Sequence, residues 1–155
     1  MKLSQNIQNR LICPVSKEKL ILSDGYFYTE NKSSIRYPVI DSIPVLINEE
    51  KSLFSINDFV GRKNTTFELG AKAKLIQAIK PLIPAIGSNI VAAKNYQQLA
   101  ELLPVNARIL VVGGSIAGRG MDVIYNNKDF EIVGSDVTFG PHTKIISDGH
   151  DLPFE

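Results

Sequence analysis

Short runs of apolar and aromatic residues, separated by turn residues, occupy the first third of the chain. Between residues 10 and 47 the runs are broken by signals such as Asp24-Gly25, a pair that is typical of two-residue hairpin turns. The runs themselves are Lys19–Leu22, Tyr26–Tyr28 and Ile35–Tyr37. This pattern predicts a small β module over residues 1–50.

The apolar pattern changes to a helical period between residues 67 and 103. Two stripes recur at three- and four-residue spacing, as expected for helices that bury one face. They consist of Leu75, Ile76, Ile79, Leu82 and Ile83, and of Ile90, Ala93, Tyr96, Leu99 and Leu103. Pro81 and Pro84 separate the stripes, and Gly87-Ser88 is a plausible start for the second helix. Residues 51–104 are therefore predicted to form a helical connector.

A third pattern, an apolar run that ends in a cluster of glycines, lies at Ile109–Met121. Such a run predicts a buried parallel strand that feeds a tight turn into a helix, where glycine permits positive φ and close approach to a ligand. Asp136 follows at about the 20-residue distance at which a carboxylate binds a nucleotide's ribose. Residues 105–155 are thus predicted to be a β-α-β-β segment of a nucleotide-binding domain, and the chain to be an α/β protein.

Two familiar phosphate-binding motifs fit these glycines poorly. In a dinucleotide fingerprint, Gly113 and Gly118 fill two of the three glycine places, but Ser115 takes the middle one, where the backbone approaches a pyrophosphate. In a P-loop, Arg119 and Gly120 stand where Lys and Ser or Thr contact phosphate and magnesium. The P-loop is excluded on chemistry, whereas part of an NAD(P)-binding protein stays as a disfavoured alternative.

The glycine cluster, Asp136 and the segment Asp148-Gly-His-Asp-Leu-Pro-Phe154 together resemble the S-adenosylmethionine site of class I methyltransferases. The last segment is similar to the Asp-Ala-x-x-Leu-Pro-Phe turn of the family's small-molecule branch. One departure is that Val111 and Val112 are apolar where many members carry an acidic residue.

The resemblance assigns a role to each candidate site residue. It implies that the glycine loop passes under the methionine part of the cofactor, that Asp136 binds the ribose hydroxyls, that Val137 lies on one face of the adenine, and that Asp148 accepts a hydrogen bond from the exocyclic amine. The implied cofactor-binding residues are Gly113, Gly114, Ser115, Gly118, Asp136, Val137, Asp148, Gly149 and His150. For His150, a plain surface-turn role is an equal alternative. No catalytic residue is identified.

The N-terminal module resembles the zinc-ribbon-like domain of tRNA-methyltransferase activator proteins, through Leu11–Ser16 and Ile35–Leu46. In the zinc-binding relatives four cysteines hold the metal, but here Ser16, Glu30 and Ser33 replace three of them. One thiolate with a carboxylate and two hydroxyls does not make a structural zinc site, so no metal is expected and Cys13 is predicted to be a small buried hydrophobe. The apolar residues predicted to hold the module together are Tyr37, Val39, Ile40, Ile43, Val45 and Leu46.

Composition and charge indicate the class of protein and its cellular compartment. The chain has 155 residues, of which 44% are hydrophobic, with one cysteine and a net charge of +1. These values are typical of a soluble globular protein and indicate neither nucleic-acid nor membrane binding. Without a signal peptide or an apolar run of about 20 residues, the chain is predicted to be cytoplasmic.

The C-terminus leads to a further expectation. A class I methyltransferase sheet has seven strands, and the sequence ends just after the turn of the third, so we expect the first half of a Rossmann-like sheet, with the methyl acceptor unknown. Enzymatic activity then depends on the remaining half. A truncated sheet exposes an edge, so association with another copy or a partner chain is expected. The main alternative is a non-catalytic interaction or activator module that uses residues 1–50.

Overall fold

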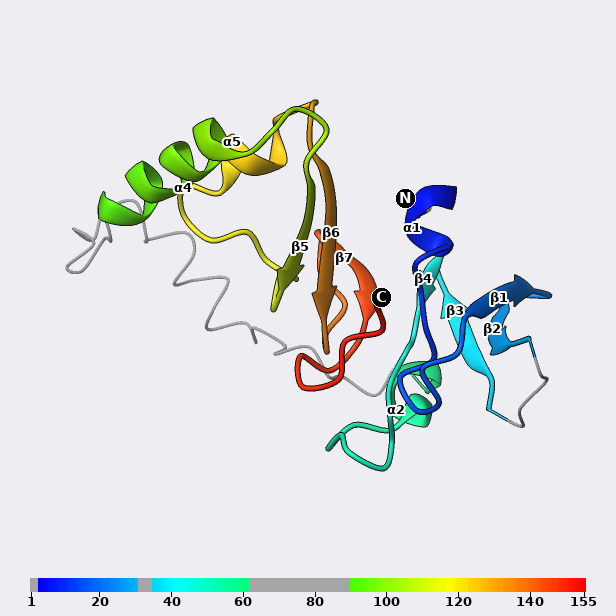
Figure 1. Cartoon of the computed structure of the whole chain (residues 1–155). Helices are drawn as coiled ribbons and strands as arrows, with labels where there is room; N and C mark the ends of the chain where they lie inside the picture. The colour runs from blue at the N-terminus through cyan, green and yellow to red at the C-terminus, as the bar shows by residue number, and fades with distance from the viewer. Residues whose placement is uncertain (1–2, 31–34, 62–89) are drawn as a thin grey trace, which may run out of the picture.

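A computed structural model describes residues 3–30, 35–61 and 90–155 of the chain. It is a mixed α/β structure with a four-stranded antiparallel sheet in the order β1-β2-β3-β4 and a three-stranded parallel sheet in the order β5-β6-β7 (Figure 1). The first predicted helical stripe, the Pro81–Ser88 separator and Ser33 lie outside the described residues.

The antiparallel sheet confirms the predicted hairpin module. Its strands are β1 (Leu20–Ser23), β2 (Tyr26–Thr29), β3 (Tyr37–Ile40) and β4 (Ile43–Pro44). Asp24 and Gly25, with φ of 50° and 78°, form the two-residue turn between β1 and β2, and positive φ at both positions is what a type I′ hairpin turn requires. Asp41 and Ser42, with φ of 50° and 68°, turn β3 into β4 in the same way.

The parallel sheet confirms the predicted β-α-β-β order. Strand β5 (Arg108–Val112) pairs in parallel with β6 (Glu131–Asp136), and β6 pairs in parallel with β7 (Thr143–Ile146). A short helix, α5 (Asp122–Tyr125), follows the glycine cluster and has Met121, the residue after Gly120, as its N-cap. The predicted succession of strand, glycine cluster and helix is therefore present, although the helix does not directly follow Gly113 and Gly114 at the end of β5.

Strand β5 is not buried, contrary to prediction. Among the described residues it pairs only with β6 and so forms the sheet edge, and its side chains alternate between exposed and half-buried. Val112 keeps 51% of its surface exposed. Apolar strands of a parallel sheet are ordinarily covered on both faces, so the apolar run identified the strand correctly but not its surroundings.

The two sheets are joined and share one core. Beyond β4, Val45 lies beside Ile146 in a parallel bridge, and the Leu46 amide donates to the Ile146 carbonyl at 2.8 Å. At the C-terminus Phe154 bridges back to Leu11. The shared hydrophobic cluster contains, among others, Leu11, Cys13, Leu20, Phe27, Tyr37 and Leu46 from the β module and Val133 and Ile145 from the parallel sheet. Residues 1–50 thus bury their apolar side against β6 and β7, which closes the outer edge of β7.

The predicted interior residues of the β module divide between that cluster and a second one, which is formed by Val45, Ile47, Phe59 and Ile146. Tyr37, Val45 and Leu46 are fully buried. The half-buried residues Val39, Ile40 and Ile43 pack against those clusters from their margins. The prediction that these six residues hold the module together is confirmed, with the addition that the parallel sheet supplies the other side.

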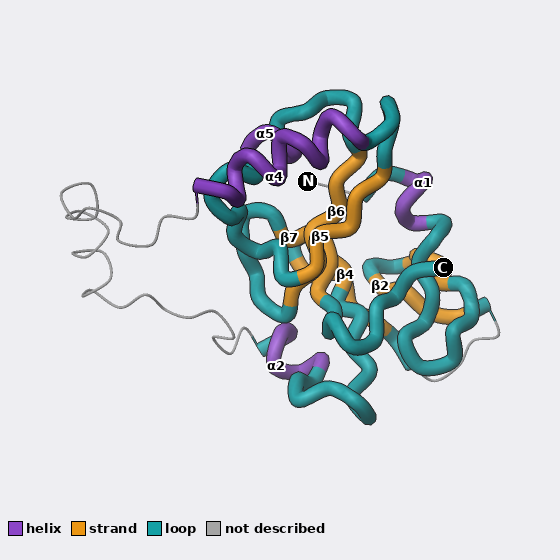
Figure 2. The backbone as a smooth tube through the Cα atoms, turned by 60° about the vertical axis from the view of Figure 1, so that its left-hand side comes forward, coloured by secondary structure: helices purple, strands orange, loops and turns teal. Residues whose placement is uncertain are grey.

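Three helices complete the described structure. Helix α1 (Gln5–Gln8) precedes the β module, and α2 (Ile56–Val60) buries Phe59 below it. Helix α4 (Ile90–Leu102), where the second helical stripe was predicted, lies beside α5 on one side of the parallel sheet (Figures 1 and 2). A methyl group added at Gly120 would lie 2.6 Å from the Ala93 Cα, so α4 packs directly on the backbone of the loop before α5.

Candidate functional site

A cavity of about 500 Å³ lies where the carboxyl ends of β5, β6 and β7 meet. Six of the nine residues predicted to bind a cofactor line it: Gly113, Asp136, Val137, Asp148, Gly149 and His150. They come from the ends of three different strands. In open α/β sheets, ligands bind outside the carboxyl ends of the strands, so this cavity is the candidate site.

Asp136, the last residue of β6, connects the two loops that border the cavity. Its Oδ2 accepts from the Ser115 amide at 2.9 Å, and its Oδ1 accepts from the amide and the hydroxyl of Thr138, both at 3.0 Å. A carboxylate has about four acceptor positions. Asp136 therefore holds the glycine loop in place and keeps one acceptor position on Oδ2 for a ligand.

Within the glycine loop, only Gly113 lies at the cavity. Gly113 has φ of 72°, and a methyl group added there would meet nothing within 4 Å. Gly114 is buried, and its added methyl would lie 2.9 Å from both the Val111 carbonyl oxygen and the Val111 Cγ1. Glycine at 114 is thus required by the loop's own packing and not by space for a ligand.

The structure does not bring Gly114, Ser115 and Gly118 to the cavity. Ser115 acts through its amide on Asp136. Gly118 is exposed, and its added methyl would lie 3.6 Å from the Met121 Sδ. The direct contacts predicted for these three residues are therefore absent from the described cavity.

Asp148, two residues beyond β7, is held by hydrogen bonds from both sides of the cavity. Its Oδ1 accepts from the His150 amide at 3.0 Å and lies 2.8 Å from the His150 Nδ1, while its Oδ2 accepts from the Ser52 hydroxyl at 2.7 Å. The His150 amide bond first, and then the Ser52 hydroxyl, lower the pKa of this carboxyl. Asp148 is thus a fixed anionic acceptor, and His150 belongs to its turn.

The segment just after the β module supplies a wall of the cavity that the sequence did not predict. Lys51, Leu53 and Phe54 line the same space as the strand ends. They follow the β module directly, and the hydroxyl of Ser52 between them ties the segment to Asp148. Nearly 100 residues separate the two partners in the sequence, and no local pattern marks such a contact, so sequence reasoning had no signal for it.

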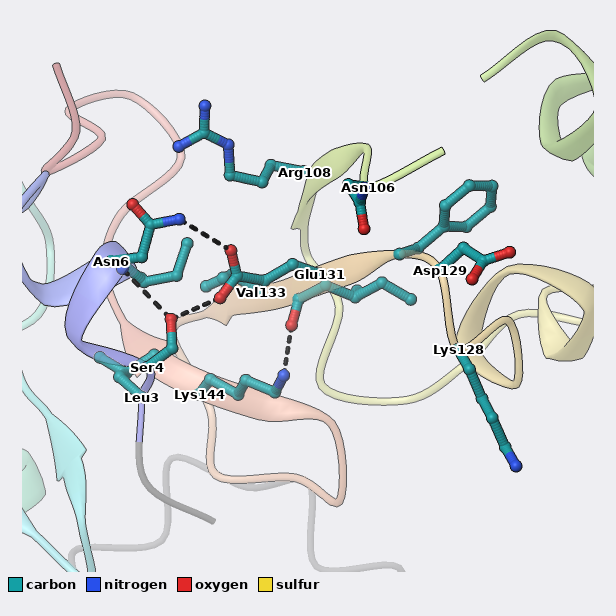
Figure 3. Close-up of a pocket in the computed structure, with 13 residues that line it drawn as sticks. Leu3, Ser4, Asn6, Asn106, Arg108, Lys128, Asp129, Glu131, Val133 and Lys144 are labelled. Atoms are coloured by element: carbon teal, nitrogen blue, oxygen red, sulfur yellow. Dashed lines mark hydrogen bonds between the residues drawn. The ribbon is translucent and has the colours of Figure 1, made fainter. Parts of the chain in front are cut away.

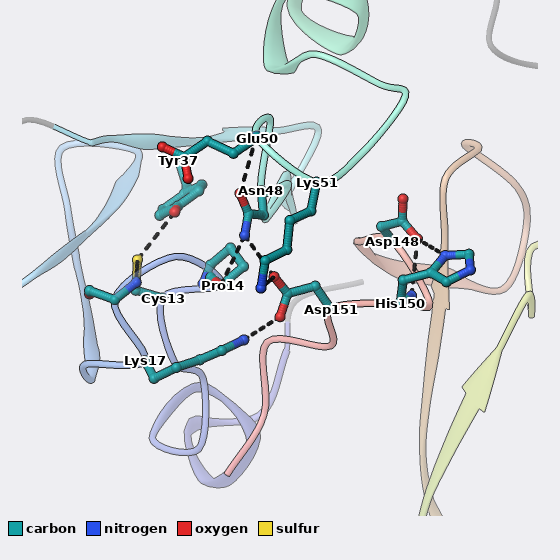
Figure 4. Close-up of polar contacts among 11 residues, drawn as sticks. Cys13, Pro14, Lys17, Tyr37, Asn48, Glu50, Lys51, Asp148, His150 and Asp151 are labelled. Atoms are coloured by element: carbon teal, nitrogen blue, oxygen red, sulfur yellow. Dashed lines mark hydrogen bonds and ion pairs between the residues drawn. The ribbon is translucent and has the colours of Figure 1, made fainter.

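A second tie between the β module and the Asp148–Asp151 turn is centred on Asp151 (Figure 4). The Asp151 Oδ2 accepts from the Asn48 Nδ2 at 2.7 Å and lies 3.9 Å from the Lys51 Nζ, and Lys17 forms an ion pair with Oδ1. Burial raises the pKa of Asp151, but the bonds from Lys17 and Asn48 outweigh burial and lower it overall. The turn beside the candidate site is therefore fastened to the β module by a charged side chain that is 10% exposed.

A larger cavity, of about 830 Å³, lies at the amino ends of β5 and β6 (Figure 3). It holds none of the predicted site residues. Two of its charged side chains contact the protein itself: the Lys144 ammonium donates to the Ile132 carbonyl, and Glu131 accepts from Ser4 and Asn6. The smaller cavity is favoured as the site because it lies at the carboxyl ends of the strands.

Cys13 is fully buried, as predicted. Its Sγ lies 3.2 Å from the Tyr37 hydroxyl and accepts from the Ser16 amide at 3.3 Å. Burial raises the pKa of the Cys13 thiol, but the hydrogen bonds of Ser16 and Tyr37 lower it by more. Within residues 3–30, 35–61 and 90–155, no three His, Cys, Asp or Glu side chains come together in a way that could hold a metal ion.

Comparison with known proteins does not identify the chain: no protein-family model matches it, and no curated protein matches it. In the part of the chain that the structure describes, no helix has both the length and the apolar character needed to cross a bilayer.

Proposed function

We propose that the cavity at the carboxyl ends of β5, β6 and β7 binds S-adenosylmethionine, and that this chain is the cofactor-binding part of a class I methyltransferase. The observation that supports the proposal is that six residues, chosen from the sequence for their roles toward this cofactor, line one cavity although they come from three strand ends. The parallel sheet brings the three strand ends together, and the two carboxylates and the glycine at those ends are the residue types that a nucleoside site uses.

The donors and acceptors present suit the adenosine part of the cofactor. Asp136 has an acceptor position free for one ribose hydroxyl, and the Thr138 hydroxyl can rotate away from Oδ1 to admit the second. Asp148 has three acceptor positions used by Ser52 and His150, which leaves one for an exocyclic amine. Val137 contributes the apolar surface that a purine face needs.

The chain's own part in the reaction is to bind and orient the cofactor. S-adenosylmethionine, when bound, supplies the reactive methyl group. Asp136, fixed by β6 and by the Ser115 amide, sets the position of the ribose. Holding the reactive centre in a defined direction is a large part of what methyl transfer requires.

Calorimetric titration of the full chain with S-adenosylhomocysteine tests the proposal, with NAD as the competing candidate. We expect S-adenosylhomocysteine to bind and Asp136→Ala to weaken it at least tenfold, since loss of a charged acceptor costs about 1.5 to 3 kcal/mol and each 1.4 kcal/mol is about tenfold. Asp129→Ala, at the larger cavity, is the matched control and should bind as the wild type does.

Because Asp136 also holds the glycine loop, a second variant separates binding from folding. Val137→Asp places a carboxylate at the proposed purine face without removing any hydrogen bond recorded for Asp136. It should weaken binding while a thermal melt stays cooperative. Tighter binding of NAD than of S-adenosylhomocysteine, or no binding of the latter by the wild type, would contradict the proposal.

The open edge of β5 favours a second property, association through that edge. Among the described residues β5 pairs on one side only, and the side chains of Leu110, Val112 and Ile116 are exposed on or near it; such edges pair readily with further strands. The alternative in which residues 1–50 dock a partner is less favoured, because their apolar side is already buried against β6 and β7.

A further inference from the structure

The wall that residues 51–54 contribute to the candidate site contains a side chain that is almost completely exposed. Leu53 lines the cavity at the strand ends, yet 99% of its surface is exposed. Ordinary exposed leucines are common and need no explanation. This one differs because it stands at a cavity between two residues that are themselves held in place.

Ser52 and Phe54 fix the position of Leu53. The Ser52 amide donates to the Asn48 carbonyl at 2.9 Å, and its hydroxyl donates to the Asp148 Oδ2 at 2.7 Å. The Phe54 amide donates to the Ser52 Oγ at 3.2 Å, and the Phe54 ring lies 6.3 Å from the ring of Phe59, which is fully buried. The backbone on either side of Leu53 is thus anchored, and its side chain is held out at the cavity.

The hydrogen bond between Ser52 and Asp148 also indicates which part of the cavity Leu53 borders. Ser52 binds Asp148, the carboxylate assigned to the exocyclic amine of adenine, so Leu53 belongs to the base end of the site. Val137 lines the same cavity from the end of β6. A flat base with two apolar faces is the ligand group that such side chains bind best.

We propose that Leu53 contacts the adenine ring of the bound cofactor and sets the affinity of the site for the base, so that the segment following the β module completes the nucleotide site. This inference rests on the proposed function. It assigns to residues 51–54 a direct binding role, in place of the linking role that their position between the β module and the helices suggests.

Titration of Leu53→Ala with S-adenosylhomocysteine and with adenosine tests the proposal. We expect about a fivefold loss of affinity for both ligands, because both carry the base, and no change in the thermal midpoint, because the exposed side chain packs against nothing in the free protein. Leu53→Met, which keeps the apolar volume, should restore most of the affinity. Leu102→Ala, in α4 and 82% exposed, is the matched control and should bind as the wild type does.

The possible outcomes distinguish a failure of the Leu53 proposal from a failure of the proposed function. If the wild type binds S-adenosylhomocysteine and Leu53→Ala binds it equally well, Leu53 has no role and the proposed function stands. A loss with S-adenosylhomocysteine but not with adenosine would place Leu53 at the amino-acid end and overturn the inference. If the wild type binds neither ligand, both proposals are wrong.

Discussion

Removing the carboxylate of Asp151 should weaken the attachment of the β module to the turn beside the candidate site. Asp151→Ala deletes a charge-assisted hydrogen bond from the Asn48 Nδ2, at 2.7 Å, and an ion pair with Lys17, whose side chain is 48% exposed. A hydrogen bond to a charged group is worth about 1.5 to 3 kcal/mol, and a partly exposed ion pair at most about 1 kcal/mol. The expected loss in the free energy of unfolding is therefore about 2 to 4 kcal/mol.

Thermal and urea melts at neutral pH measure this loss. For a chain of this size each kcal/mol moves the midpoint by about 2 to 4 °C, so the midpoint should fall by about 4 to 16 °C. Glu155→Ala is the matched control, since it removes an ion pair with Lys19 at 3.8 Å in which both side chains are exposed, and it should cost less than about 0.5 kcal/mol. Equal midpoints for the two variants would refute the reasoning that Asp151 fastens the module.

Three further predictions follow from particular contacts. The pKa values of Asp148 and Asp151 are lowered in the folded state, so the stabilisation that these carboxylates provide is complete above the ordinary carboxyl value of 3.8 and is lost as pH falls through the lowered values. Urea melts from pH 6 to pH 2 should show this loss. The stability of the Asp151→Ala variant should converge with that of the wild type at the acid end. Gly114→Ala should lower the thermal midpoint by several degrees, since its methyl would collide with Val111; an unchanged midpoint would mean that the loop can rearrange. Association through β5 should appear in sedimentation as mass that rises with concentration, and Leu110→Lys, which charges the exposed edge, should abolish that rise.

Local patterns predicted the parts of this fold whose causes are local. The Asp24-Gly25 turn follows from positive φ at two adjacent positions, and the parallel strands follow from apolar runs that end in glycine or aspartate. The sequence also identified the residues at the strand ends, because a parallel sheet brings all carboxyl ends to one side. Six of them met at one cavity for that reason.

What the sequence could not predict depends on contacts between distant segments. The apolar run of β5 reads the same whether the strand is central or at an edge, so its exposure was missed. The part of Ser52 and Leu53 in the site depends on a hydrogen bond to Asp148, which no spacing rule encodes. The role of Gly114 was misread because a glycine needed for packing and one needed for a ligand look identical in a sequence.

The most direct test of the central claim is an amide chemical-shift map of the full chain with S-adenosylhomocysteine added to saturation. We predict the largest shifts at the cavity formed by the strand ends, at Gly113, Val137 and Gly149. The amides of Arg108 and Asp129, at the larger cavity by the amino ends of the strands, should stay unchanged. Shifts centred on that opposite cavity, or no shifts at all, would contradict the account.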